Sequence, residues 1–388
     1  MRIGMVAWSF YPRVGGSVTT VMQLSKSLVE NGIEVDIVAP LLQKDIYKIK
    51  GLNLDKRIKI HWVISSFARS YSDFYSRGIF FLKMTIKIRT MSRYVDVFHA
   101  HDFNISLLSA IIGTNKAVIS VFGADPLFEA FNYKRKSYIN YEEFLKNRII
   151  IILQKIINAA IFIISGNRLT VISLNKYLNK IIERYHGGQV VNIPAGIDLD
   201  LYRSNRIGER KTKSILVVAR FMPWKEIGKA IEIFMKVKRF NKEAEMILIG
   251  GGLMQRHYIA KYKNAEGLRF IGDMDCQKTI EYYKKADIFL ITSQYETFGI
   301  TVIEAMAAGL AVVASDLHVF HDRLTDDINC YLVSGGDVSV FADRILSVLN
   351  NASIRGKFIN NSLNIVENYN IDRICGSYIS LYNKLSKL

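Results

Sequence analysis

The sequence predicts an α/β protein built from two Rossmann-like domains, each with a parallel sheet. Short apolar runs recur along the chain, and segments with helical periodicity separate them. The same rhythm occurs in both halves. The chain has 388 residues, which exceeds the roughly 250–300 residues at which a single hydrophobic core stops growing.

The first half opens with an apolar strand at 3–8, a loop at 9–16 and a helix at 17–31. Apolar side chains recur at helical spacing in this helix, with Ser17 available as its N-cap and Gly32 as the residue after its C-cap. Later elements are strands at 35–39, 95–98, 117–121 and 169–173, a helix at 175–184, and a strand that enters a Pro/Gly turn at 190–198.

A second series of strands follows the polar stretch 204–214, which is typical of an interdomain linker. Its strands are expected at 215–219, 246–250, 268–271, 288–291 and 311–314. The predicted domains are therefore 1–203 and 215–365, with a C-terminal helix at 366–388 that can pack back on the first domain.

Cysteine usage and the N-terminus indicate a cytoplasmic protein. Cys276, Cys330 and Cys375 lie far apart without C-x-x-C spacing, which argues against a disulfide framework or a zinc site. The N-terminal segment is expected to be a first strand and leaves no room for a signal-peptide core. The apolar stretch 149–164 is shorter than the roughly 20 residues of a spanning helix, so we interpret it as a buried or interfacial helix.

The formal net charge of +17 calls for an acidic partner. Residues 61–94 carry six basic residues and a single acid, Asp73, interleaved with aromatic side chains, and a second basic cluster lies at 134–136. This mixture suits an anionic membrane surface, although a solvated helix face over core aromatics explains it equally well. No helix-turn-helix, RNP-type or zinc-finger pattern accompanies the charge, so nucleic acid is not expected as a partner.

The most informative stretch is 293–309, a loop and helix between two apolar strands. Phe298 and Gly299 bring free N–H groups and the positive end of the helix dipole to one spot, which suits a diphosphate. Glu296 and Glu304 suit the hydroxyls of a ribose or a hexose, because an ionised carboxylate accepts hydrogen bonds. Either glutamate alone would more simply be a helix-start acid or a solvated loop acid.

Both glutamates together resemble the E-x7-E motif of retaining glycosyltransferases with the GT-B fold, specifically glycosyltransferase family 4. Three weaker family motifs precede it along the chain in the expected order, at 96–102, 192–198 and 219–225. The resemblance covers nearly the whole chain. It implies two Rossmann-like domains facing each other across an interdomain cleft, the first on the acceptor side and the second binding the nucleotide sugar.

The resemblance also implies residue roles. Glu296 would contact the donor sugar, Glu304 would hold the nucleotide ribose, and Arg220 with Lys225 would bind the diphosphate, since a leaving phosphate needs fixed positive charge around it. Further donor contacts are expected from Gly16, Gly251, Ile271, Phe298, Gly299, Ile300 and Thr301.

The sequence departs from the family pattern at the position of a frequent histidine. Family members often carry histidine at the position of Phe122, which cannot hydrogen-bond a substrate. Any catalytic histidine role therefore moves to His101 or is absent, with His99 expected to be packed.

No metal and no cofactor are expected. Asp273 and Asp275 superficially match a D-x-D metal site, but we interpret them as part of a turn. His99 and His101 could form a metal pair, yet a third ligand is not evident. A nicotinamide cofactor lacks the G-x-G-x-x-G pattern. The resemblance suggests a front-face displacement in which the departing phosphate accepts the proton of the acceptor.

The expected function is transfer of a hexose-type sugar, with retention, from a nucleotide-diphosphate donor to a lipid-linked or saccharide acceptor in glycan or glycolipid synthesis. The enzyme would lie peripherally on the cytoplasmic face of the membrane. One alternative is a sugar-nucleotide epimerase of the same architecture, which would need no acceptor. Another is an inactive relative that binds membrane or nucleic acid, against which the intact candidate site residues argue.

Overall fold

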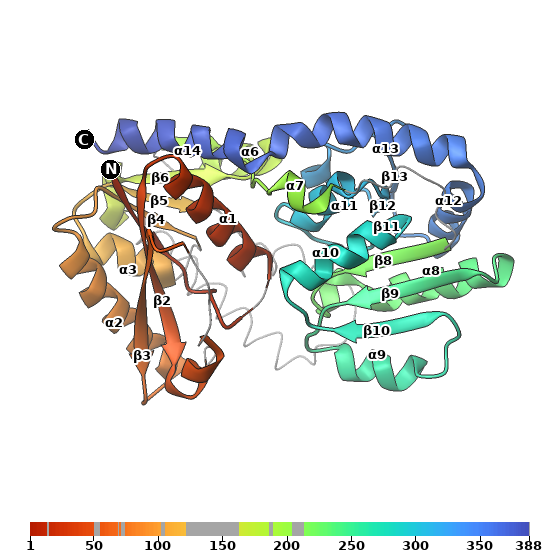
Figure 1. Ribbon diagram of the computed structural model, residues 1–388, viewed down its shortest axis with the longest axis horizontal. Coiled ribbons are helices and arrows are strands. Elements are labelled where there is room, and N and C mark those ends of the chain that lie inside the picture. Colours follow the sequence, from red (N-terminus) through yellow and green to blue (C-terminus); the bar gives the residue numbers. More distant parts are fainter. Residues whose placement is uncertain are drawn as a thin grey trace. The chain divides into compact units, whose positions relative to one another are not determined.

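The computed structural model describes residues 1–13, 15–49, 55–68, 70, 74–101, 105–121, 163–185, 189–203 and 213–387. The chain divides into two compact units, Met1–Gly196 with Asp372–Leu388 and Ile197–Ile371, each with one parallel sheet (Figure 1). This confirms the predicted α/β class. Outside the described residues lie Phe122, the basic cluster 134–136, the apolar stretch up to 162, and most of the expected linker.

The first unit has a seven-stranded parallel sheet in the order β3-β2-β1-β4-β5-β6-β7. Met5 of β1 pairs with Ile37 of β2 on one side and with His99 of β4 on the other. The strands are β1 (Arg2–Val6), β2 (Glu34–Leu42), β3 (Ile58–Ser65), β4 (Val97–Ala100), β5 (Val118–Val121), β6 (Leu169–Ser173) and β7 (Gln189–Asn192). Strand β3 was not predicted.

Helices of this unit are α1 (Gly16–Glu30), α2 (Phe74–Met91), α3 (Ile105–Gly113), α6 (Lys176–Tyr185) and α14 (Ile371–Leu385). Helices α2 and α3 pack against each other beside the sheet (Figure 1). The buried side of α2 presents Phe80, Met84 and Ile88 at helical spacing. The expected N-cap of α1 was wrong by two residues, because Gly15 rather than Ser17 is its N-cap.

The second unit has a six-stranded parallel sheet in the order β10-β9-β8-β11-β12-β13. Its strands are β8 (Lys213–Val218), β9 (Ala244–Ile249), β10 (Leu268–Gly272), β11 (Ile288–Ile291), β12 (Ala311–Ser315) and β13 (Cys330–Val333), the last of which was not predicted. Its helices are α7 (Leu199–Tyr202), α8 (Ile227–Phe240), α9 (Gln255–Tyr262), α10 (Cys276–Lys285), α11 (Ile300–Ala307), α12 (Val338–Asn350) and α13 (Ala352–Val366). Side chains of α8 and α12 share one core cluster with the strands.

Strand order reverses once in each sheet, between β1 and β4 in the first unit and between β8 and β11 in the second. At such a switch point the connections leave neighbouring strands toward opposite faces, which opens a crevice beyond their carboxyl ends. These two positions are where each unit is expected to bind a ligand.

Among the described residues, no helix is both long enough and apolar enough to cross a bilayer. Cys276, Cys330 and Cys375 form no disulfide bond with one another.

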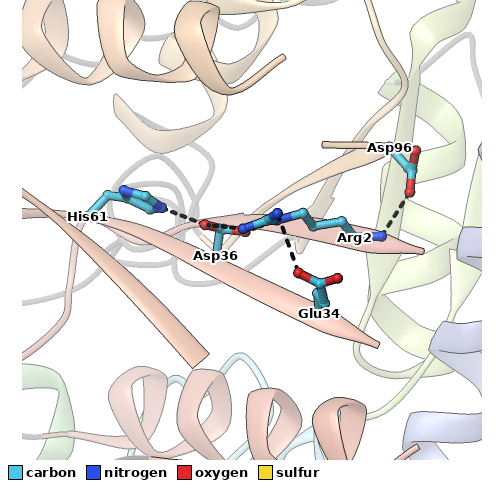
Figure 2. A network of polar contacts seen from close by, with 5 residues as sticks. All are labelled: Arg2, Glu34, Asp36, His61 and Asp96. Atoms are coloured by element: carbon cyan, nitrogen blue, oxygen red, sulfur yellow. Dashed lines mark hydrogen bonds and ion pairs between the residues drawn. The ribbon is translucent and has the colours of Figure 1, made fainter. Parts of the chain in front are cut away.

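A buried carboxylate joins three strands of the first sheet. Asp36 of β2 is fully buried between Arg2 and His61, which contact its two oxygens at 2.5 Å each (Figure 2). Arg2 also reaches Glu34 at 3.3 Å, and its backbone N–H donates to Asp96 at 2.8 Å. Burial acts to raise the pKa of Asp36, but the hydrogen bonds from His61 and Arg2 outweigh it and hold the pKa below its ordinary value.

Asp36→Ala is expected to lower the free energy of unfolding by about 3–5 kcal/mol, because it leaves the partly buried side chains of Arg2 and His61 without their buried acceptor. Glu34→Ala is the matched control. Its carboxylate contacts the same arginine but is 61% exposed, so its loss should cost no more than about 1 kcal/mol. Urea unfolding of both variants checks this, and equal effects would contradict it.

Candidate functional site

The switch point of the second unit is occupied by an ion pair. Lys225 ends a short 3₁₀ turn after β8, and Glu296 lies in the loop after β11. The Nζ atom of Lys225 lies 2.5 Å from Oε1 of Glu296, which also accepts a hydrogen bond from the Ser293 hydroxyl at 2.8 Å. The other carboxylate oxygen, Oε2, accepts no hydrogen bond from any residue that the structure describes. Two candidate residues predicted from separate motifs are thus in direct contact.

Further hydrogen bonds join the same two loops. The hydroxyl of Thr292 donates to the carbonyls of Lys225 and Glu226 at 3.2 and 3.1 Å. The backbone N–H of Gln294 donates to the carbonyl of Trp224 at 2.8 Å. Because backbone groups carry most of these bonds, the geometry of the ion pair is fixed before any ligand arrives.

Arg220 precedes Lys225 by five residues, but its side chain is exposed to solvent. It follows β8, its backbone carbonyl accepts the N–H of Met222 at 2.8 Å, and its guanidinium makes no hydrogen bond or ion pair with the described residues. A guanidinium in this state retains its donors for an incoming anion.

The start of helix α11 is shaped by Gly299. This residue is the N-cap, with φ of 75°, and a Cβ there would meet Cε1 of Phe320 at 2.6 Å. Both facts exclude a side chain at this position. Ile300 and Thr301 form the first turn, whose N–H groups have no acceptor within the helix. Phe298 is buried beside them.

Glu304 is held by two tyrosines that were not predicted. Tyr202 of α7 and Tyr283 of α10 each donate a hydrogen bond of 2.8 Å, one to each carboxylate oxygen. The side chain is only 7% exposed. Burial raises its pKa, and the two tyrosine hydrogen bonds oppose that rise. The contact of Glu304 with a ribose stays a prediction.

The neighbouring strands β9 and β10 end in a close contact. A Cβ on Gly251 would meet Oδ2 of Asp273 at 2.5 Å, so the glycine lets the two loops approach. Asp275 is the N-cap of α10 and accepts the N–H of Lys278 at 2.8 Å, which gives it a structural role. Ile271, near the end of β10, is half-buried. No group of three His, Cys, Asp or Glu in the described part of the chain is placed to hold a metal ion.

In the first unit, His101 and Gly16 lie after β4 and β1, the two strands of its switch point. His99 is fully buried, contacts the Tyr382 hydroxyl through Nδ1 at 2.7 Å, and stacks on His101 at 4.1 Å between ring centroids. Burial lowers the pKa of His101 to about 3 and that of His99 well below its ordinary value. Gly16 begins α1 and is exposed.

The candidate residues of the second unit therefore lie at or after the carboxyl ends of its strands. His101 and Gly16 lie after the carboxyl ends of two strands of the first unit. Sequence reasoning missed Thr292, Ser293, Tyr202 and Tyr283. The two hydroxyl residues adjoin the motif and could have been found. The tyrosines could not, because neither stands at a fixed spacing from Glu304.

Comparisons with known proteins identify the family and the fold. A family model described as Glycosyltransferase Family 4 matches residues 14–201, and one described as Glycosyl transferases group 1 matches residues 203–364. A solved structure of sucrose-phosphate synthase from Thermosynechococcus elongatus superposes with a TM-score of 0.76 at 19% identity, covering 99% of this chain and 98% of that one.

Two relatives of similar length also match. Alpha-monoglucosyldiacylglycerol synthase of Acholeplasma laidlawii is 27% identical, covering 85% of this chain and 84% of its own length. Phosphatidyl-myo-inositol mannosyltransferase of Mycolicibacterium smegmatis is 23% identical, covering 100% of this chain and 94% of its own.

The fold and the family matches define a glycosyltransferase with the GT-B fold. The two models between them cover most of the sequence, and the chain belongs to glycosyltransferase family 4.

Proposed function

We propose that this enzyme transfers a hexose, with retention of configuration, from a nucleoside-diphosphate sugar to a lipid-linked acceptor at an anionic membrane surface. The observation that carries the proposal is the Lys225–Glu296 pair at the β8/β11 switch point, beside the start of α11. Support for a lipid acceptor comes from two relatives, a monoglucosyldiacylglycerol synthase and a phosphatidyl-myo-inositol mannosyltransferase. Each is named after a lipid, and they match 85% and 100% of this chain. A saccharide acceptor is the competing case.

In the proposed reaction, the bond from the anomeric carbon to the donor phosphate breaks while the acceptor oxygen bonds to the same face of the sugar. The departing phosphate takes the acceptor proton. Negative charge grows on that phosphate, so Lys225, Arg220 and the N–H groups of α11 stabilise the transition state. The free oxygen of Glu296 accepts a hydroxyl of the sugar, which orients the donor.

These protein cations are expected to replace a metal. Arg220→Ala should lower turnover by ~10²–10³, the scale for one preorganised donor, and Lys225→Ala should act similarly. The double variant should lose less than the product of the two, since both act on one diphosphate. The control is Arg239→Ala, an exposed arginine in the last turn of α8.

Activity should also survive a chelator. Asp275→Ala should remove a helix cap at a cost of about 1 kcal/mol in stability and leave turnover of the folded enzyme nearly unchanged. Loss of turnover on chelation, with recovery on adding magnesium or manganese, would show that the metal-free proposal is wrong.

Glu304 provides a test of nucleotide binding itself. Calorimetry with UDP, GDP and ADP should identify one that binds the wild-type enzyme, and Glu304→Ala should weaken it by roughly 1.5–3 kcal/mol, the range for charged hydrogen bonds. Glu296→Gln should spare that affinity and lower turnover. Glu281→Ala, which changes an exposed carboxylate of α10, is the control. Unchanged affinity in folded Glu304→Ala would overturn the ribose assignment.

Helix α2 supplies the surface proposed to meet the membrane. Opposite its buried residues, Tyr75, Leu82 and Ile86 are 69%, 59% and 59% exposed. These three and the exposed Arg89 lie within a stripe about 60° wide on the helix, and Arg93 follows just beyond its end. Apolar side chains flanked by cations suit the interface of an anionic bilayer.

Binding to vesicles that contain anionic lipid should exceed binding to neutral vesicles and should fall as salt rises, because exposed charges are screened beyond ~10 Å at 0.1 M salt. Substituting Arg89 and Arg93 with Gln should weaken it, as should Leu82→Ser with Ile86→Ser. The control changes Lys278 and Lys285, two exposed lysines of α10, to Gln. Equal recovery in the supernatant with both vesicle types at low salt would instead favour a soluble saccharide acceptor.

A further inference from the structure

A buried cation lies against the start of α11. Arg323 is only 2% exposed and follows a short 3₁₀ turn after β12. Its guanidinium lies 4.5 Å from the ring centroid of Phe298 and 5.2 Å from that of Phe320. Its backbone is fixed, since its carbonyl accepts a hydrogen bond from Asn329 at 2.8 Å and its N–H donates to Phe320 at 2.9 Å. The direction of the side chain is thus set by the fold.

This cation is poorly compensated. Nη1 donates to the carbonyl of Val319 at 3.2 Å, while Nε and Nη2 are buried with no hydrogen-bond partner among the described residues. Burial lowers the pKa of Arg323, and the nearby side chain of Tyr369, through charge and hydrogen bonding, opposes that shift together with Asp322 and Glu296. Unpaired N–H groups of a buried cation cost free energy, and an apolar side chain of similar volume would avoid that cost. Packing alone therefore does not explain an arginine here.

The unpaired atom points to the N-cap of α11. Nη2 lies 3.6 Å from the position that a Cβ on Gly299 would take. Two sources of positive potential thus act at the same place, the guanidinium and the free N–H groups of the first helical turn. The guanidinium also lies over the ring of Phe298, the residue before the N-cap.

We infer that Arg323 is a positioning residue for the donor diphosphate. It holds Phe298 and Gly299 so that the first N–H groups of α11 point at the diphosphate, and its buried charge adds to their attraction. The inference rests on the proposed function, because it requires a diphosphate at this helix start. Arg323 retains its charge at an unfavourable place because the anion, when bound, compensates it.

The test separates charge from packing with Arg323→Met and Arg323→Gln, which remove the cation, and Arg323→Lys, which keeps it. Calorimetry measures the affinity of each for the nucleoside diphosphate that the wild-type enzyme binds among UDP, GDP and ADP, and for the corresponding uncharged nucleoside. Urea unfolding measures stability. Arg344→Met is the control, because Arg344 also stacks on an aromatic ring, that of Tyr331 at 4.3 Å, away from α11.

For Arg323→Met we expect diphosphate affinity to fall about tenfold, within the usual range of coupling between sites. Nucleoside affinity and unfolding stability should be retained, with partial recovery of diphosphate affinity in Arg323→Lys. Arg323→Gln should show the same selective loss if the Met variant does not fold. An equal loss of nucleoside and diphosphate affinity, or none, would overturn this inference alone. Failure of the wild-type enzyme to bind any of the three diphosphates would overturn the proposed function and this inference with it.

Discussion

The ion pair between Lys225 and Glu296 is the interaction on which the candidate site depends. Strands β8 and β11 are neighbours, yet 71 residues separate these two side chains, so only the reversal of strand order brings them together. Both are largely shielded from water, with side chains 19% and 9% exposed. Removing either partner would leave a partly desolvated charge, which makes the pair a strong constraint on the two loops.

Charges around this pair are compensated to different degrees, and the differences indicate where a ligand is needed. Glu304 already receives two tyrosine hydrogen bonds. Glu296 uses one oxygen, whereas Arg220 and two nitrogens of Arg323 have no partner in the described part of the chain. The unpaired nitrogens of Arg323 thus place positive charge beside the start of α11, as a diphosphate would require.

Sequence predicted what local patterns determine. The apolar runs predicted β8, β11 and β12, and the E-x7-E spacing predicted the loop and helix between β11 and β12. Strand β3 was missed because exposed and half-buried residues such as Lys59 and His61 interrupt its apolar pattern, and because its second half lies within the basic and aromatic stretch 61–94. The tyrosine contacts to Glu304 were missed because the partners are separated by 102 and 21 residues in the sequence, so that no local pattern links them.

The histidines of the first unit bear on the proton transfer. Since burial lowers the pKa of His101 to about 3, its imidazole is neutral at pH 7 and is a weak acceptor of a proton. His99, hydrogen-bonded to Tyr382 of α14 and stacked on His101, is held in the same neutral state. A histidine of this kind can orient an acceptor hydroxyl through a hydrogen bond but cannot easily deprotonate it. In the reaction proposed above, the proton goes instead to the departing phosphate, whose negative charge is growing.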